Sequence, residues 1–141
     1  MQEPTGRILA SELAQQFVDF TQSIEGIQLD YSVSSLERVD EIIEKMRREG
    51  LKVGDADRVL FIAGCYVGEV IVRHQPGIWV SAEESSVYAN AGPTIILKFG
   101  SEQYTSPIGK VIKRLQNGEE DYLPFYYQML AKLIKDGPPH R

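Results

Sequence analysis

The stretch that most constrains the fold is VLFIAGCYVG, residues 59–68, which continues through a single glutamate, Glu69, to His74. This apolar run is much shorter than the roughly 20 residues that cross a bilayer. Apolar side chains occupy nearly every turn, which is typical of a helix covered on most sides. We therefore predict a buried helix over residues 58–74, ended by Gln-Pro-Gly at residues 75–77, because proline cannot continue a helix.

Four further helices are predicted from apolar side chains that recur at helical spacing. A helix before Gly26 has an inner stripe of Leu9, Leu13, Phe17, Phe20 and Ile24. A helix before Gly50 has an inner stripe of Leu36, Val39, Ile43 and Met46. A helix over residues 107–118 has an inner stripe of Ile108, Val111, Ile112 and Leu115. The last helix, from about residue 121 to residue 135, carries Phe125, Tyr126, Leu130, Leu133 and Ile134.

Several helix starts carry capping signals. Ser34 lies three residues before Glu37, the spacing of a capping box, although Ser32 is a second candidate N-cap. Ser106 followed by Pro107 marks the start of another helix. We expect Asp55 or Asp57 to cap the buried helix. On the second helix we expect two ion pairs, Glu41 with Lys45 and Glu44 with Arg48.

Between residues 77 and 105 the pattern changes to short segments rich in β-branched and aromatic residues. GIWVS, SVYANA and TIILKFG predict three strands, and EQYT adds a short fourth. The order of three helices, an antiparallel meander of three to four strands and two helices predicts a single α+β domain over residues 1–141. We expect the helices to pack on one face of the sheet, with the other face exposed or used for a partner.

The chain lacks the common catalytic motifs, so no catalytic, cofactor-binding or metal-binding residue is predicted. It contains no phosphate-binding P-loop, no G-x-S-x-G turn, one cysteine and two histidines. Cys65 and His74 lie nine residues apart, which on one helix places them on opposite sides and more than about 13 Å apart along the axis. Cys65 is predicted to be a buried apolar side chain. Asp55 and Asp57 are interpreted as favourable charges at a helix start rather than as cation ligands.

Glu69 is the polar residue that the buried helix has to accommodate. A buried carboxylate needs partners, because leaving it unpaired costs several kcal/mol or forces it to take up a proton. Arg73 lies one turn further on, and Trp79, Tyr66 or Tyr88 can donate a hydrogen bond from elsewhere. Two interpretations stay open: a structural ion pair at the rim of the core, or a pocket lined by these residues.

Two glycines in the same helix, Gly64 and Gly68, lie one turn apart. Glycine in a helix interior costs up to about 1 kcal/mol relative to alanine. Close packing against a neighbouring element offsets such a cost. We therefore predict that another segment lies directly against this side of the helix.

Three segments together resemble a known arrangement: LDYSVSSLERVDEII, then AGCYVGEVIVRH followed closely by Trp79, then SPIGKVIKRLQNGEEDYLPFYY. This layout resembles small uncharacterised bacterial α+β domains, a family of unknown function, in which a Y-x-G-E-V helix precedes a short sheet. The resemblance implies a bacterial, cytoplasmic protein that folds as a stand-alone α+β domain. It implies no catalytic residues.

Charge favours some classes of partner over others. Residues 1–97 hold 15 acidic and 8 basic side chains, whereas residues 98–141 hold 5 acidic and 7 basic ones. Such an acidic surface repels nucleic acid and suits a basic protein partner. No apolar segment of signal-peptide length occurs near the N-terminus, and a lone cysteine fits a reducing cytoplasm. No membrane association is expected.

These observations predict a non-enzymatic, cytoplasmic protein-interaction domain of a regulatory or immunity-like kind. A homodimer formed through the sheet is a further expectation. The alternative is a small-ligand-binding protein or an enzyme with a pocket near Glu69, Arg73 and Trp79.

Overall fold

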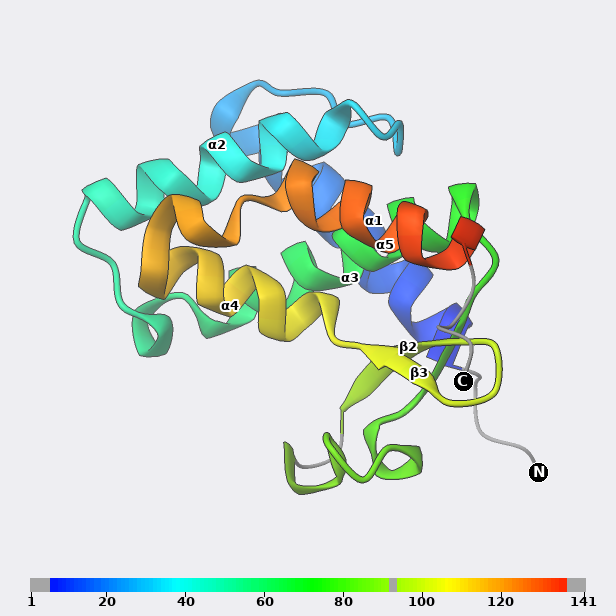
Figure 1. The fold of residues 1–141 in the computed structure, drawn as a ribbon. Helices are drawn as coiled ribbons and strands as arrows, with labels where there is room; N and C mark the ends of the chain where they lie inside the picture. The colour runs from blue at the N-terminus through cyan, green and yellow to red at the C-terminus, as the bar shows by residue number, and fades with distance from the viewer. Residues whose placement is uncertain (1–5, 92–93, 137–141) are drawn as a thin grey trace.

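The computed structural model describes residues 6–91 and 94–136, which form an α+β fold of five helices and a three-stranded antiparallel sheet. Figure 1 shows the helices gathered together, with the sheet at one end of them. The helices are α1 (Gly6–Glu25), α2 (Ser35–Arg48), α3 (Asp57–His74), α4 (Pro107–Asn117) and α5 (Leu123–Asp136). The strands are β1 (Ile78–Ser81), β2 (Ile95–Phe99) and β3 (Gln103–Thr105). Short 3₁₀ turns are η1 (Val53–Asp55), η2 (Ala82–Glu84), η3 (Ala89–Ala91) and η4 (Gly118–Asp121).

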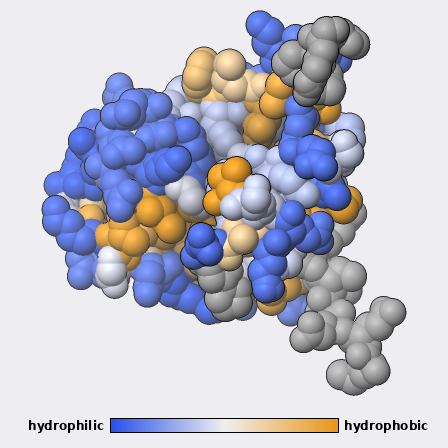
Figure 2. Space-filling view, turned by 60° about the horizontal axis from the view of Figure 1, so that its bottom comes forward, coloured by the Kyte–Doolittle hydropathy of each residue, from blue (hydrophilic) through white to orange (hydrophobic). Residues whose placement is uncertain are grey.

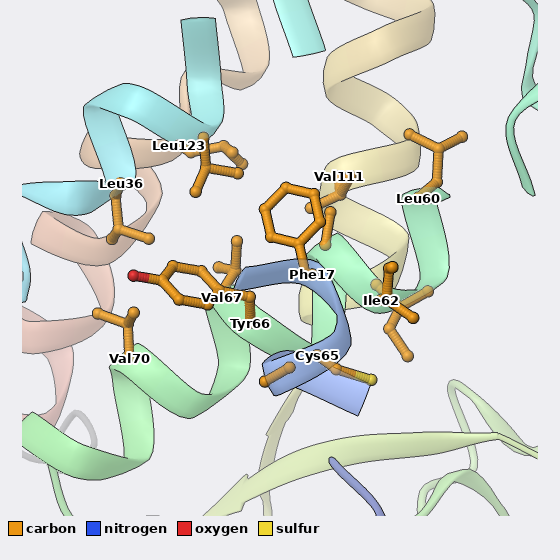
Figure 3. Packing of buried hydrophobic residues seen from close by; sticks show 14 of the residues in the cluster. Phe17, Leu36, Leu60, Ile62, Cys65, Tyr66, Val67, Val70, Val111 and Leu123 are labelled. Carbon is orange, nitrogen blue, oxygen red and sulfur yellow. The ribbon is translucent and has the colours of Figure 1, made fainter. Parts of the chain in front are cut away.

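Helix α3 is the centre of the fold, as its apolar sequence predicts. Its side chains are buried almost continuously from Leu60 to Ile71, and it packs most extensively on α1 and α4. Figure 3 shows Phe17 of α1, Leu36 of α2, Val111 of α4 and Leu123 of α5 gathered around Tyr66 and Val67 of α3. The ring centroids of Phe17 and Tyr66 are 5.8 Å apart in a tilted arrangement, which favours aromatic contact.

The two glycines of α3 are sites of close approach, and that prediction is confirmed. A Cβ atom added at Gly64 would lie 2.4 Å from the Cα atom of Ile108 in α4. A Cβ atom added at Gly68 would lie 2.2 Å from two ring carbons of Trp79 in β1. The absent side chains therefore let α4 and the sheet pack directly on the backbone of α3.

The predicted inner stripe of α1 is wrong at both ends. Leu9 is 44% exposed and Ile24 is 65% exposed. The buried side of the helix is instead formed by Ala10, Leu13, Ala14, Phe17, Val18 and Thr21. Ala10 and Ala14 are fully buried, so the buried line runs beside the one that the largest side chains define. Gly26, at φ 67°, ends the helix as predicted.

Two of the predicted local contacts in and before α2 differ from those observed. Ser34 makes no capping bond, and the hydroxyl of Ser32, the second candidate, accepts the Ser35 N–H at 3.2 Å. Lys45 pairs with Glu25 of α1 at 3.1 Å rather than with Glu41. The predicted pair of Glu44 and Arg48 does form, at 2.9 Å.

Neither aspartate caps α3, contrary to prediction. The residue before the helix is Ala56, and no side chain caps it. The Asp55 carboxylate instead accepts the backbone N–H of Lys52 at 3.0 Å, which closes η1. At α4 the prediction holds, because the Ser106 hydroxyl accepts the Gly109 N–H at 2.9 Å and Pro107 occupies the first turn.

The sheet has the order β1-β2-β3, with each neighbouring pair antiparallel. The predicted strand SVYANA is wrong: residues 86–88 form turns and residues 89–91 form η3. EQYT supplies the third strand, β3. One face of the sheet contributes Trp79, Leu97 and Phe99 to the main core.

The opposite sheet face is partly covered, which corrects the expectation of a free face. Val80, Ala82 and Ile96 form a second, smaller core cluster on that side. Tyr88, from the segment predicted as a strand, and Tyr104 pack against this cluster. The segment after β1 therefore folds back over the sheet instead of joining it.

Candidate functional site

Glu69 lies on the side of α3 that faces the sheet, and its side chain is 1% exposed. Trp79 of β1 donates its indole N–H to Glu69 Oε2 at 2.9 Å. The ring can approach this closely because Gly68 presents no side chain to it. One sequence feature, a glycine directly before a glutamate, thus places an indole donor at the buried carboxylate.

The other carboxylate oxygen of Glu69 is bound by Arg73, one turn further along α3. Arg73 donates from Nε at 3.3 Å and from Nη2 at 3.2 Å to Glu69 Oε1. The Arg73 side chain is 37% exposed, so the ion pair lies at the rim of the core. The predicted Glu69–Arg73 pair is confirmed, and the buried charge is compensated by charge-assisted hydrogen bonds.

Tyr31, in the connection between α1 and α2, completes the arrangement. The Arg73 guanidinium carbon lies 3.7 Å from the centroid of the Tyr31 ring, a cation–π contact. Tyr31 has φ 64°, a backbone conformation that costs a non-glycine residue about 1–3 kcal/mol. Its N–H donates to Tyr66 Oη at 2.9 Å, and its carbonyl oxygen lies 2.9 Å from His74 Nε2. We call Glu69, Arg73, Trp79 and Tyr31 the Glu69 cluster.

Two of the predicted donors, Tyr66 and Tyr88, do not bond to Glu69, although Tyr66 adjoins the cluster through its contact with Tyr31. Tyr66 points toward α2, where its hydroxyl lies 2.7 Å from Ser35 Oγ. Tyr88 packs in the second core cluster, which lies on the sheet face opposite Trp79. Tyr31 was not predicted, because nothing in its local sequence indicates a left-handed residue or a contact with α3.

Glu69 is expected to contribute to stability. Glutamine at this position keeps one acceptor oxygen, but its amide NH₂ group replaces the other and faces a donor, either the Trp79 indole or the Arg73 guanidinium. We expect Glu69→Gln to lower the free energy of unfolding by about 1–3 kcal/mol. Urea unfolding followed by Trp79 fluorescence measures this change, because Trp79 is the single tryptophan. The exposed Glu102→Gln variant is the control, and an unchanged or higher stability for Glu69→Gln would favour the ligand-pocket interpretation.

Cys65 is fully buried, as predicted. Burial, assisted by the nearby negative charge of Glu69, raises the pKa of its thiol to about 12. Relative to the ordinary value of 9.0, the thiolate population at neutral pH falls about a thousandfold. We expect a thiol reagent at pH 8 to modify the folded chain at least about 100-fold more slowly than the urea-unfolded chain. Rapid modification of the folded chain would contradict this burial.

A second buried polar cluster was missed by the sequence-based prediction. Arg114 of α4 is 2% exposed and donates to Asp40 of α2 through Nε at 2.8 Å and Nη2 at 3.0 Å. Its Nη1 donates to Glu44 at 2.9 Å. Asp40 also accepts the backbone N–H of Leu123 at 3.0 Å. Although burial acts to lower the pKa of Arg114, these hydrogen bonds raise it overall, so the guanidinium stays charged.

The signal for this second cluster was present in the helical spacing. Asp40 lies between Val39 and Ile43 on the inner side of α2, and Arg114 lies next to Leu115 of α4. Opposite charges on the inner sides of two helices indicate a buried pair. The pair joins α2, α4 and the start of α5. Because the charged groups of Asp40 and Arg114 are hydrogen-bonded within the protein, a structural role is favoured.

A surface groove of about 680 Å³ lies at the C-terminal ends of α2 and α4. It is lined by Arg47, Gly50, Leu51, Lys52, Val53, Gly54, Leu115 and Gln116. None of the Glu69 cluster belongs to this lining. Among the residues that the structure describes, no group of three or more His, Cys, Asp or Glu side chains is placed to hold a metal ion.

Comparisons with protein-family models, curated proteins and solved structures give no match to this chain. Within residues 6–91 and 94–136, none of the helices has the length and apolar content needed to cross a membrane. Function is therefore inferred from the residues and their geometry alone.

Proposed function

We propose that the protein is a non-enzymatic interaction domain that regulates or neutralises a protein partner in the cytoplasm. The main support is an exposed apolar line along α5, which we call the α5 stripe: Tyr122, Phe125, Met129 and Leu133. These side chains are 40%, 55%, 51% and 41% exposed, respectively. Exposed apolar surface of this kind often marks a protein interface.

The partner's chemistry follows from the charges near the α5 stripe. Glu37 and Glu41 of α2 and Glu119 and Glu120 of η4 are exposed near its first residue, Tyr122. The matching surface has an apolar line with basic groups at one end. The expected partner therefore carries apolar side chains as well as basic ones, because the acidic groups here lie beside exposed apolar side chains.

Three features support an interaction role over catalysis at the Glu69 cluster. The Glu69 carboxylate is 1% exposed, and both of its oxygens accept hydrogen bonds from side chains of the protein. Cys65 is buried and its thiol pKa is raised. Figure 2 shows hydrophobic areas between hydrophilic ones on the outer surface, where a partner can reach them.

Affinity capture from an extract of the source organism tests this function. Wild-type bait at low salt is compared with a Phe125→Glu/Met129→Glu bait and with Val87→Glu, an apolar-to-acidic change at an 80% exposed site outside α5. We expect the wild-type and Val87→Glu baits to capture the same partner protein, in amounts that fall as the salt concentration rises. The Phe125→Glu/Met129→Glu bait should not capture it. Equal capture by all three baits would overturn the proposal.

The alternative, a small-ligand site at Glu69, Arg73 and Trp79, requires the hydrogen bonds of Glu69 to open. A thermal-shift screen of metabolites tests it. A compound that stabilises wild type but not Glu69→Gln would support the alternative.

A further inference from the structure

Helix α5 carries apolar side chains on two sides. Leu123 and Tyr127 are buried against the rest of the fold, with Tyr126, Leu130 and Ile134 partly buried beside them. The α5 stripe lies on another side, because Phe125, Met129 and Leu133 follow one another at intervals of four residues, and the exposed Tyr122 directly precedes the helix. A helix that needed only one buried side would carry polar residues there.

The two ends of the α5 stripe carry opposite charge. Around Tyr122 lie the exposed Glu37, Glu41, Glu119 and Glu120, with Arg38 of α2 offsetting part of their charge. Near Leu133 lie the exposed Lys132 and Lys135, offset in part by Asp136. The surface is therefore acidic at the start of α5 and basic toward its end.

We propose that the α5 stripe is covered by the α5 stripe of a second copy of this chain, with the two helices antiparallel about a twofold axis. This inference rests on the proposed function and names the partner. The spacing is nearly symmetric, because the midpoints of the two pairings differ by half a residue, or about 0.75 Å: Tyr122 meets Leu133 of the second copy, and Phe125 meets Met129 of the second copy. Each side chain thus finds an apolar counterpart, including two sulfur–aromatic contacts.

The same antiparallel arrangement brings opposite charges of the two copies together. It brings Lys132 and Lys135 of each copy to the acidic end of the other copy. A parallel arrangement would instead place acidic groups against acidic groups and lysines against lysines, which electrostatic repulsion disfavours. A second copy therefore supplies both parts of the partner chemistry derived above, an apolar line and basic groups at one end.

The contact is small. From Leu123 to Leu133 the helix rises about 15 Å at 1.5 Å per residue. Two helices in contact over this length bury less than the roughly 1,200–2,000 Å² of a standard stable interface. The association is therefore a reversible, concentration-dependent one.

Analytical ultracentrifugation of the full chain tests the proposal. At low salt, we expect the average mass of the wild type to rise from 15.9 kDa toward twice that value as concentration increases from micromolar to millimolar. Met129→Glu should stay at 15.9 kDa throughout, because it brings a carboxylate to the ring of Phe125. Val87→Glu should behave as wild type. Circular dichroism should show the same fold in all three.

A charge swap tests the antiparallel register. Lys132→Glu should raise the dissociation constant at least about tenfold, and adding Glu119→Lys should restore it to near the wild-type value. Dimerisation that Met129→Glu abolishes but Lys132→Glu leaves unchanged would overturn the register. A wild-type mass that stays at 15.9 kDa at millimolar concentration would overturn the second-copy proposal, while affinity capture would still decide the proposed function separately.

Discussion

Asp40→Ala is expected to lower the free energy of unfolding by about 3–5 kcal/mol. The substitution removes two of the three hydrogen bonds that the buried Arg114 guanidinium donates and leaves Glu44 as its only carboxylate partner in this cluster. It also deprives the buried N–H of Leu123 of its acceptor. Urea unfolding monitored by circular dichroism measures the loss.

The controls separate the buried charge from the loss of a carboxylate as such. Glu41→Ala, one residue further along on the exposed side of α2, should change stability by no more than about 0.5 kcal/mol. Adding Arg114→Met to Asp40→Ala removes the uncompensated guanidinium and should recover at least about 2 kcal/mol. If the double variant is no more stable than Asp40→Ala, the ion pair is not the source of the loss.

The second large effect is expected at Gly64, where a methyl group has no room. An added Cβ atom would lie 2.4 Å from the Cα atom of Ile108 and 2.7 Å from its Cγ1 atom. Because one of these contacts is backbone, α4 as a whole has to move. We expect Gly64→Ala to lower the free energy of unfolding by about 2–3 kcal/mol, despite the gain of about 1 kcal/mol in helix propensity.

Gly54→Ala is the matched control, since an added Cβ atom there would meet nothing within 4 Å. It should leave the stability within about 0.5 kcal/mol of wild type. Both variants are compared by thermal and urea unfolding under one condition. Equal stability of the two would contradict the direct contact of α3 with α4.

The helices were predictable because the signals that define them are local. Apolar spacing, the break at Gln75 to Gly77 and the Ser106 cap depend on residues within a few positions of one another. The Glu69–Arg73 pair belongs to the same class, because both side chains lie one turn apart on a single helix. The close packing at Gly64 and Gly68 was also predictable, since a glycine cost inside a helix calls for a compensating contact.

The errors share one cause, which is competition between local preference and packing with distant segments. Residues 86–91 have strand-like composition, yet they fold back because Tyr88 finds an apolar surface formed by Val80 and Ile96. In α1 the buried side includes the small Ala10 and Ala14, whereas the larger Leu9 is left 44% exposed. Lys45 likewise pairs with Glu25 on another helix in preference to its neighbour in α2.

Local patterns in the chain were enough to predict that α3 is a covered helix, that its carboxylate needs partners and that helices accompany a small sheet. The contacts between distant segments followed from packing: Trp79 and Tyr31 lie around Glu69 and Arg73, Arg114 lies against Asp40, and Phe125 and Met129 are left on the outside of α5. The physical reason is that helical spacing fixes which residues share a side, whereas the identity of the opposing surface depends on how segments far apart in the chain pack together.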